Sequence, residues 1–92
     1  MKYVVAKGVI NGEEVELPFL FPMQINHNEF AALVPRMFYA RMGDFHEIVS
    51  AGFYRGGRSS GRSETLNIKS RPEDTALIKG EPAPRQSVKE DE

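Results

Sequence analysis

The chain has 92 residues, 40% of them hydrophobic and 27% charged, and its formal net charge is −1. This size fits one globular domain, and the absence of cysteine excludes disulfides, thiolate nucleophiles and cysteine-based metal centres. The near-neutral charge gives no general attraction to nucleic acid or anionic membranes. The apolar stretch 15–30 is interrupted by Pro18, Pro22 and Asn26, which excludes a transmembrane helix there.

The first 21 residues predict a β-hairpin. Two segments rich in β-branched and aromatic residues flank Asn11-Gly12, a dipeptide that tolerates positive φ at both central positions of a type I′ turn. A two-residue loop sets the register, so Ile10 should face Glu13 and Val4 should face Phe19. One face of the hairpin is then apolar and is expected to join the core: Val4, Ala6, Ile10, Val15, Leu17, Phe19 and Phe21.

A helix with an internal break is predicted next. Asn26 is a favourable N-cap, and Glu29 three residues later completes a capping box. Apolar residues then recur at helical spacing over 30–38. Pro35 lies inside this run and removes a backbone donor, which predicts a kink or a second helix that starts at this proline. Gly43 is the expected left-handed cap at the end.

Two further strands are predicted over 45–54 and 64–70. Between them, residues 55–62 comprise three glycines, two serines and three arginines, a composition typical of a flexible loop. One helical turn is expected near 76–78. The proline-containing segment 80–92 has an acidic end and predicts a disordered tail.

The predicted element order is therefore β-β-α-β-β with a short closing helical turn. This order favours a single α+β domain over 1–79, in which one kinked helix packs on a face of a small, mainly antiparallel sheet. No internal repeat is present.

Enzymatic chemistry has little support in the sequence. The chain contains two histidines, His27 and His46, and only His46 has carboxylates beside it, at Asp44 and Glu47. No activated nucleophile or metal-binding spacing accompanies them. We expect no catalytic residue, no metal site and no cofactor, with both histidines in structural or solvated positions.

The arginine-rich stretch suggests a nucleic-acid hypothesis. Arg55, Arg58 and Arg62 lie on a glycine-rich backbone with no acidic residue between them. Such segments bind phosphates, and Phe53 just upstream offers a ring on which a base can stack. The alternative is a solvated hairpin loop without a ligand, which the short length and the negative net charge favour. The glycines match neither a P-loop nor a dinucleotide motif.

A surplus of apolar residues favours a protein interface. These residues lie on the outward face of the hairpin, on the helix and at the end of the third strand. They indicate either a core with two apolar faces or an exposed patch that mediates assembly. The leading hypothesis is a non-enzymatic module that binds a protein partner or a second copy of itself, and not a membrane. Its expected interface residues are Tyr3, Val5, Val9, Phe38, Tyr39 and Tyr54.

Two stretches carry a resemblance. Val49-Ser-Ala-Gly-Phe53 and residues 63–74 resemble segments of small uncharacterised proteins encoded in phages and prophages. The resemblance implies a phage-type origin, where proteins this small are commonly structural, accessory or inhibitory binders. It includes no catalytic motif and assigns no functional residue.

The expected location is the cytoplasm. Lys2 is followed by only four apolar residues before Lys7, so the start of the sequence does not resemble a secretory signal peptide.

Overall fold

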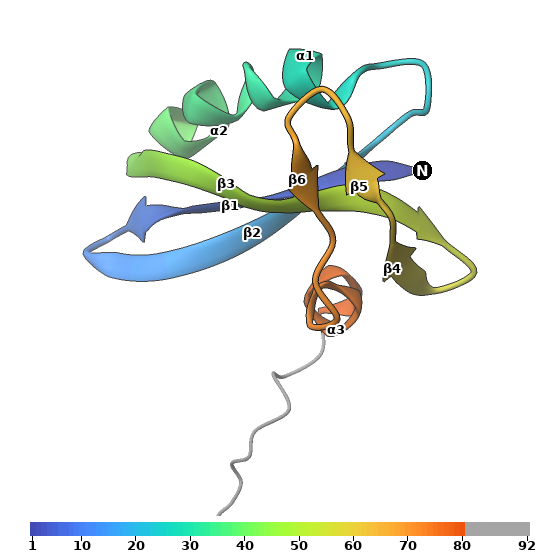
Figure 1. Cartoon of the computed structure of the whole chain (residues 1–92). Helices are drawn as coiled ribbons and strands as arrows, with labels where there is room; N and C mark the ends of the chain where they lie inside the picture. The colour runs from blue at the N-terminus through green and yellow to red at the C-terminus, as the bar shows by residue number, and fades with distance from the viewer. Residues whose placement is uncertain (81–92) are drawn as a thin grey trace, which may run out of the picture.

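The first strand of the chain pairs on both of its sides. In the computed structural model, which describes residues 1–80, β1 (Lys2–Ile10) lies between β2 (Glu13–Phe21) and β3 (Gly43–Arg55), antiparallel to both. The short β4 (Arg58–Ser60) pairs with the end of β3, so the sheet order is β2-β1-β3-β4. These four strands form the layer on which the rest of the chain packs (Figure 1).

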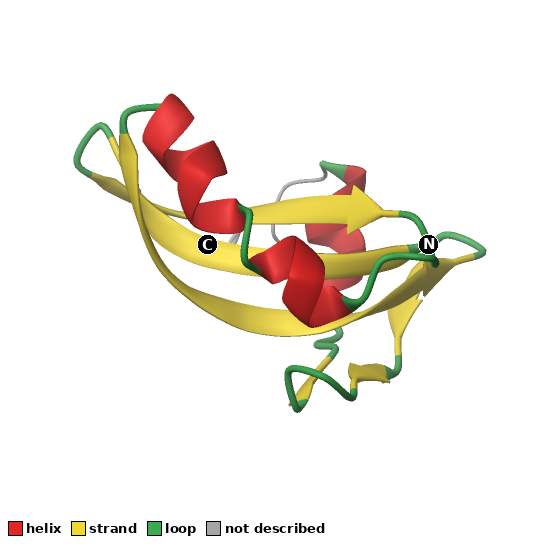
Figure 2. Ribbon diagram, turned by 90° about the horizontal axis from the view of Figure 1, so that it is seen from above, coloured by secondary structure: helices red, strands yellow, loops and turns green. Residues whose placement is uncertain are grey.

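Helices cover both faces of this sheet. The helices α1 (His27–Ala31) and α2 (Val34–Ala40) cross one face (Figure 2). A second antiparallel pair, β5 (Arg62–Ser63) and β6 (Ile68–Lys69), leads to α3 (Asp74–Lys79) on the opposite face (Figure 1). No helix within residues 1–80 is both long and apolar enough to cross a membrane.

The chain is thus an α+β protein with a mainly antiparallel sheet and one bent helical segment, as predicted. The observed order is β-β-α-α-β-β-β-β-α, so the predicted β-β-α-β-β order is not confirmed in detail. Of the single strand expected over 64–70 only β6 is present, because residues 64–67 form a turn with Asn67 at φ 57°. β4 and β5 lie before it, within 58–63, on either side of Gly61 (φ 75°).

The N-terminal hairpin has the predicted register. Ile10 lies opposite Glu13 and Val4 opposite Phe19, and the central turn residues Asn11 and Gly12 have φ of 54° and 80°. All seven predicted core residues belong to the hydrophobic cluster under α1 and α2 or pack against it. The turn chemistry and the apolar alternation therefore determine this part of the fold together.

The helical break also lies where Pro35 predicts it. The chain leaves α1 after Ala31 and re-enters a helix at Val34, with the proline in the first turn of α2. The Asn26 backbone amide donates to the Glu29 carboxylate at 3.0 Å, as the capping box requires. The left-handed residue after α2 is Met42 (φ 59°) and not Gly43, so the cap prediction is wrong by one position.

Two bulges in β3 change which residues face the core. The β1–β3 register shifts between Val5 and Ala6 and again between Lys7 and Gly8. Each shift gives β3 an extra residue, so Ile48 and Ala51 both lie on the core side although they are three positions apart. A strand over 45–54 with strict two-residue alternation would place them on opposite faces, and the bulges are the reason that it does not.

The second face of the sheet is covered and not solvated. Tyr3 and Val5 are fully buried, and α3 contacts β2 and β4 across this face. Apolar residues are therefore buried on both faces of the sheet. A core with two apolar faces is one of the two explanations given above for the surplus of apolar residues, the other being an exposed patch.

The stretch 55–62 is not one loop. Gly56 and Gly57 have φ of 61° and 77° and form a tight turn between β3 and β4, with Arg55 opposite Arg58. Glycine accepts these conformations without a steric penalty, whereas other residues do not. Gly80 (φ 75°) ends α3 as a left-handed cap, and the remaining predicted tail lies outside the described residues.

The close approach of Gly8 to α2 gives a first prediction. A Cβ at this position would overlap the Phe38 ring and the Asp44 carbonyl oxygen. We expect Gly8→Ala to lower the free energy of unfolding by about 1–3 kcal/mol, as overpacking does. Urea denaturation measures this, and adding Phe38→Leu should recover part of the loss. A Gly8→Ala protein as stable as wild type would contradict this packing.

Candidate functional site

The two histidines occupy different environments. His27 is buried, and its ring Nε2 lies 2.8 Å from the Gly52 carbonyl oxygen, to which it donates. Its ring also meets Phe21 and Phe53 edge-on, with centroids 5.5 and 5.6 Å away. Burial lowers the pKa of His27, although the bond to Gly52 opposes this, and the charge of nearby Lys2 lowers it further. A neutral imidazole fixed in this way positions α1 on β3.

His46 is exposed and stands apart. Within residues 1–80 no group of three histidine and carboxylate side chains is placed to hold a metal ion.

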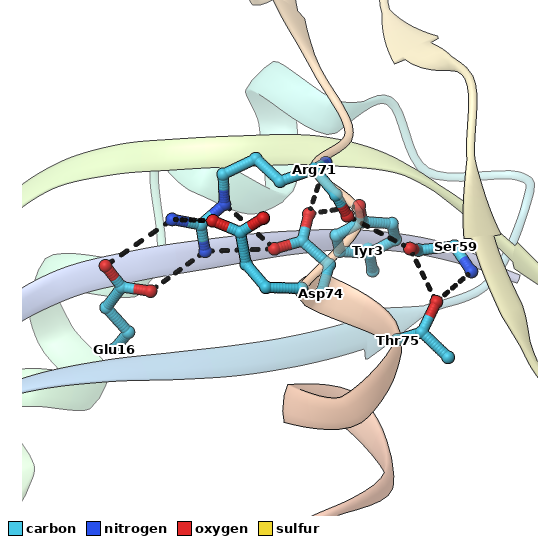
Figure 3. A network of polar contacts seen from close by, with 7 residues as sticks. Tyr3, Glu16, Ser59, Arg71, Asp74 and Thr75 are labelled. Carbon is cyan, nitrogen blue, oxygen red and sulfur yellow. Dashed lines mark hydrogen bonds and ion pairs between the residues drawn. The ribbon is translucent and has the colours of Figure 1, made fainter. Parts of the chain in front are cut away.

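The most connected polar group is a buried carboxylate on the second face. Asp74 is fully buried at the start of α3, and the Tyr3 hydroxyl donates to its Oδ2 at 2.5 Å (Figure 3). The backbone amide and Nε of Arg71 donate to the two carboxylate oxygens, each at 2.9 Å. A buried charge is tolerated only when it is paired and hydrogen-bonded in this manner.

Arg71 links this group to the opposite edge of the sheet. Its NH2 group lies 2.8 Å from Glu16 Oε1 on β2 and 2.9 Å from Asp74 Oδ1. Burial opposes the charge of Arg71, but the bonds and charges of Glu16 and Asp74 outweigh it and raise its pKa. On the other side Thr75 accepts from the Ser59 amide at 3.0 Å, which ties α3 to β4 (Figure 3). We call Tyr3, Glu16, Arg71 and Asp74 the latch.

The latch joins β1, β2 and α3, and its polar groups are occupied by one another. Burial and the bond to Asp74 raise the pKa of Tyr3 well above its usual range, which keeps its hydroxyl protonated. Such a group is a hydrogen-bond donor and not a base. The latch is accordingly a structural clamp that holds the C-terminal segment on the sheet.

The structure does not bring the six predicted interface residues together. Tyr3, Val5 and Phe38 are fully buried within the chain, and Val9 and Tyr54 are half-buried. The prediction that Tyr3, Val5 and Phe38 form an accessible surface is therefore wrong, because the second face of the sheet is covered, with Tyr3 bonded to Asp74 of α3, and Phe38 belongs to the hydrophobic core cluster. Tyr39 is the exception, with 83% of its surface exposed.

Sequence reasoning did not place Met42 in the interface. Its exposed fraction is 87%, and it lies with Tyr39 and Ala40 around an open depression of about 540 Å³ at the end of α2. We call these three residues the α2-end surface. Asp44 also lines the depression, and Arg41 is exposed beside it. The only sequence signal for this surface was the helical periodicity of apolar residues. Tyr39 and Met42 lie outside the apolar arc of the helix that this periodicity predicts.

The predicted nucleic-acid residues fall into two groups. Phe53 and Arg62 line a cavity of about 440 Å³ together with Lys2, which sequence reasoning missed because it lies fifty residues away. Arg58 lines a different cavity of about 410 Å³ with Arg71 and Thr75, on the side of α3. Arg55 lies at the turn between β3 and β4, opposite Arg58. The structure therefore brings together Phe53 and Arg62 but separates Arg58 from both.

The latch gives an alkaline prediction. Because the folded protein keeps Tyr3 protonated above its ordinary pKa of about 10, stability is complete below that pH and falls as the pH rises beyond it. Tyr3→Phe should cost about 1–3 kcal/mol at neutral pH and flatten this alkaline decline. Urea denaturation from pH 8 to about 11 measures both. Tyr39→Phe, at an exposed tyrosine, is the matched control, and an unchanged decline in Tyr3→Phe would contradict the assignment.

His27 predicts a loss of stability at acidic pH. Its pKa is lowered in the folded state, so its contribution is complete above about pH 6.5 and is lost as the pH falls below that value. We expect wild-type stability to decrease between pH 7 and about 5, and His27→Gln, which keeps a donor for Gly52, to remove much of this slope. His46→Gln should retain it. A slope that follows His46 would refute the assignment.

Comparison of the chain with protein-family models, with curated proteins and with solved structures finds no match in any of the three. The resemblance of residues 49–53 and 63–74 to phage-encoded proteins stays a prediction. Function is therefore argued from the geometry of the described residues.

Proposed function

We propose that this chain is a non-enzymatic protein-interaction module that associates with a second copy of itself through the α2-end surface. The proposal keeps Tyr39 from the sequence-based interface and replaces the buried residues by Ala40 and Met42. An origin in a phage, where small binding proteins are common, is part of the same proposal.

The conformation of Met42 carries the proposal. Its φ of 59° is left-handed, which costs a residue with a Cβ about 1–2 kcal/mol. Within the chain this conformation serves to cap α2, where the Met42 amide donates to the Tyr39 carbonyl oxygen at 2.9 Å, but the side chain is 87% exposed and gains no packing from it. Strained residues concentrate at functional sites, and the flexible thioether of methionine is favoured at protein-binding surfaces.

Tyr39 supports the same surface. A tyrosine that is 83% exposed contributes little to its own fold, whereas tyrosine is among the residues enriched in the energetic centres of interfaces. Methionine sulfur contacts aromatic rings favourably. In a two-fold contact, Tyr39 of each copy packs on Met42 of the other.

Charge placement favours a second copy over an unrelated partner. Arg41 and Asp44 lie on either side of Met42 in the sequence, and both are exposed. A two-fold axis repeats the same surface on both partners, so each arginine can approach the other copy's aspartate. A surface of three residues is small by the standards of stable complexes, so a weak, concentration-dependent dimer is expected.

Met42→Gly separates stability from association. Glycine accepts the left-handed conformation, so the free energy of unfolding should rise by about 0.5–1 kcal/mol. The same change removes the methionine from the contact and should weaken the dimer roughly tenfold. Sedimentation equilibrium over a concentration series measures association, and urea denaturation measures stability.

Tyr39→Ser should weaken the dimer without this gain in stability. Met23→Ser is the matched control, since Met23 is 45% exposed but lies outside the α2-end surface. A wild-type chain that remains monomeric throughout the series would refute the proposal. A dimer that both variants leave intact would place the contact elsewhere.

A further inference from the structure

We propose that the cavity lined by Lys2, Phe53 and Arg62 binds single-stranded nucleic acid, with one base on the Phe53 ring and phosphates on the two cations. This binding function is distinct from self-association and does not depend on it. The cavity lies where the start of β1, the end of β3, β5 and the start of α1 meet.

The two cations keep their charge available. Lys2 Nζ donates to the Ile25 carbonyl oxygen at 2.9 Å, and Arg62 donates to the side-chain oxygen of Asn67. Both acceptors are neutral, and among residues 1–80 the ion pairs involve only Arg71. Hydrogen bonds to neutral oxygens hold the two side chains in place without neutralising them, which suits the binding of an anion.

The charge of the cavity fits a phosphodiester. Glu64 also lines it, so one of the two positive charges is balanced and the lining carries a single net positive charge. A net positive lining attracts the negative charge that each phosphodiester of a polynucleotide carries.

Phe53 is held as a platform for a base. Its ring meets the buried ring of His27 edge-on at 89°, and a Cβ on Gly61 would lie 3.0 Å from its Cδ2. These neighbours restrain the ring while part of it lines the cavity. Stacking on a restrained aromatic ring is the main sequence-tolerant interaction of single-strand binding proteins.

The remaining lining groups suit a nucleotide. Asn26 and Thr65 place an amide and a hydroxyl at the cavity, where they can meet a base edge or a sugar. Its volume of about 440 Å³ is within the range of small-ligand sites. Because a base inside a duplex is already stacked on its neighbours, a recessed ring selects an unpaired base.

Further cations extend the site. Lys69 lies opposite Arg62 in the β5–β6 pair. Arg55 and Arg58 flank the β3–β4 turn outside the cavity, and Arg58 lines the separate cavity beside α3. Lys79 Nζ would lie 3.8 Å from a Cβ on Gly57 in the same turn. No acidic residue occurs between 48 and 63, so the charged side chains on that stretch are all positive. An acidic peptide would find the same charges but has no ring to place on Phe53.

Fluorescence anisotropy of the full chain with labelled oligothymidylate tests the site. A length of about 12 nucleotides lies within the 4–16 that single-strand binding folds cover. Affinity should fall with salt, and Arg62→Gln should reduce the slope of log K against log salt by about 0.7 for its phosphate. Phe53→Leu should weaken binding roughly tenfold and leave that slope unchanged. Arg36→Gln, at an exposed arginine on α2, is the matched control and should change neither quantity.

Competition identifies the ligand class. A duplex of the same length should compete at least tenfold less well than the single strand, and poly-glutamate should compete less well still. Absence of binding at low salt would overturn the proposal. Unchanged affinity in Phe53→Leu, with the variant shown by circular dichroism to be folded, would also overturn it. Equal competition by poly-glutamate would overturn it as well and would indicate that the cations bind an acidic protein. The Met42→Gly variant, in which self-association is weakened, should bind the oligonucleotide as wild type does. Nucleic-acid binding can therefore be tested whether or not the chain self-associates.

Discussion

The buried carboxylate of Asp74 is the constraint on which the rest of the structure depends. A charge with no exposed surface is stable only with full pairing, and Tyr3 and Arg71 supply it from β1 and from the segment before α3. Arg71 in turn reaches Glu16 at the edge of the sheet. These contacts hold the C-terminal segment on the second face, so a chain without disulfides buries residues on both faces of its sheet, where a domain this small would otherwise bury little surface.

Both faces of the sheet are covered, and the two candidate binding regions lie at its ends. The end near the Asn11-Gly12 turn carries the α2-end surface, which is apolar with charges of both signs around it. The end near Lys2 carries the cavity and the arginine-flanked turn of β3 and β4. The two ends therefore offer different chemistry, one suited to a protein contact and the other to an anion.

The two proposed functions are compatible because of this separation. Gly8 pairs with Phe45 beside α2, whereas Lys2 pairs with Phe53 beside the cavity. The two positions are six residue steps apart along an extended strand, which corresponds to about 20 Å. In a dimer formed through the α2-end surface, the two cavities would point away from the contact, and each could hold its own strand.

Local patterns determined the elements whose causes are local in the sequence. Asn11-Gly12 predicted the turn and with it the whole β1–β2 register, and Pro35 predicted the break between α1 and α2, because both effects act through the backbone of adjacent residues. The same logic identified Phe53, Arg62 and Tyr39 as candidates for binding.

Tertiary structure alone decided which of those candidates share a site and which faces are covered. The burial of Asp74 depends on distant residues, since Tyr3 donates to it and Glu16 holds its other partner, Arg71, and so the outward face of the hairpin was predicted to be open. The β3 bulges and the grouping of Lys2 with Arg62 also arise from pairing between distant segments. Such contacts depend on the whole packed chain, and no pattern of neighbouring residues encodes them.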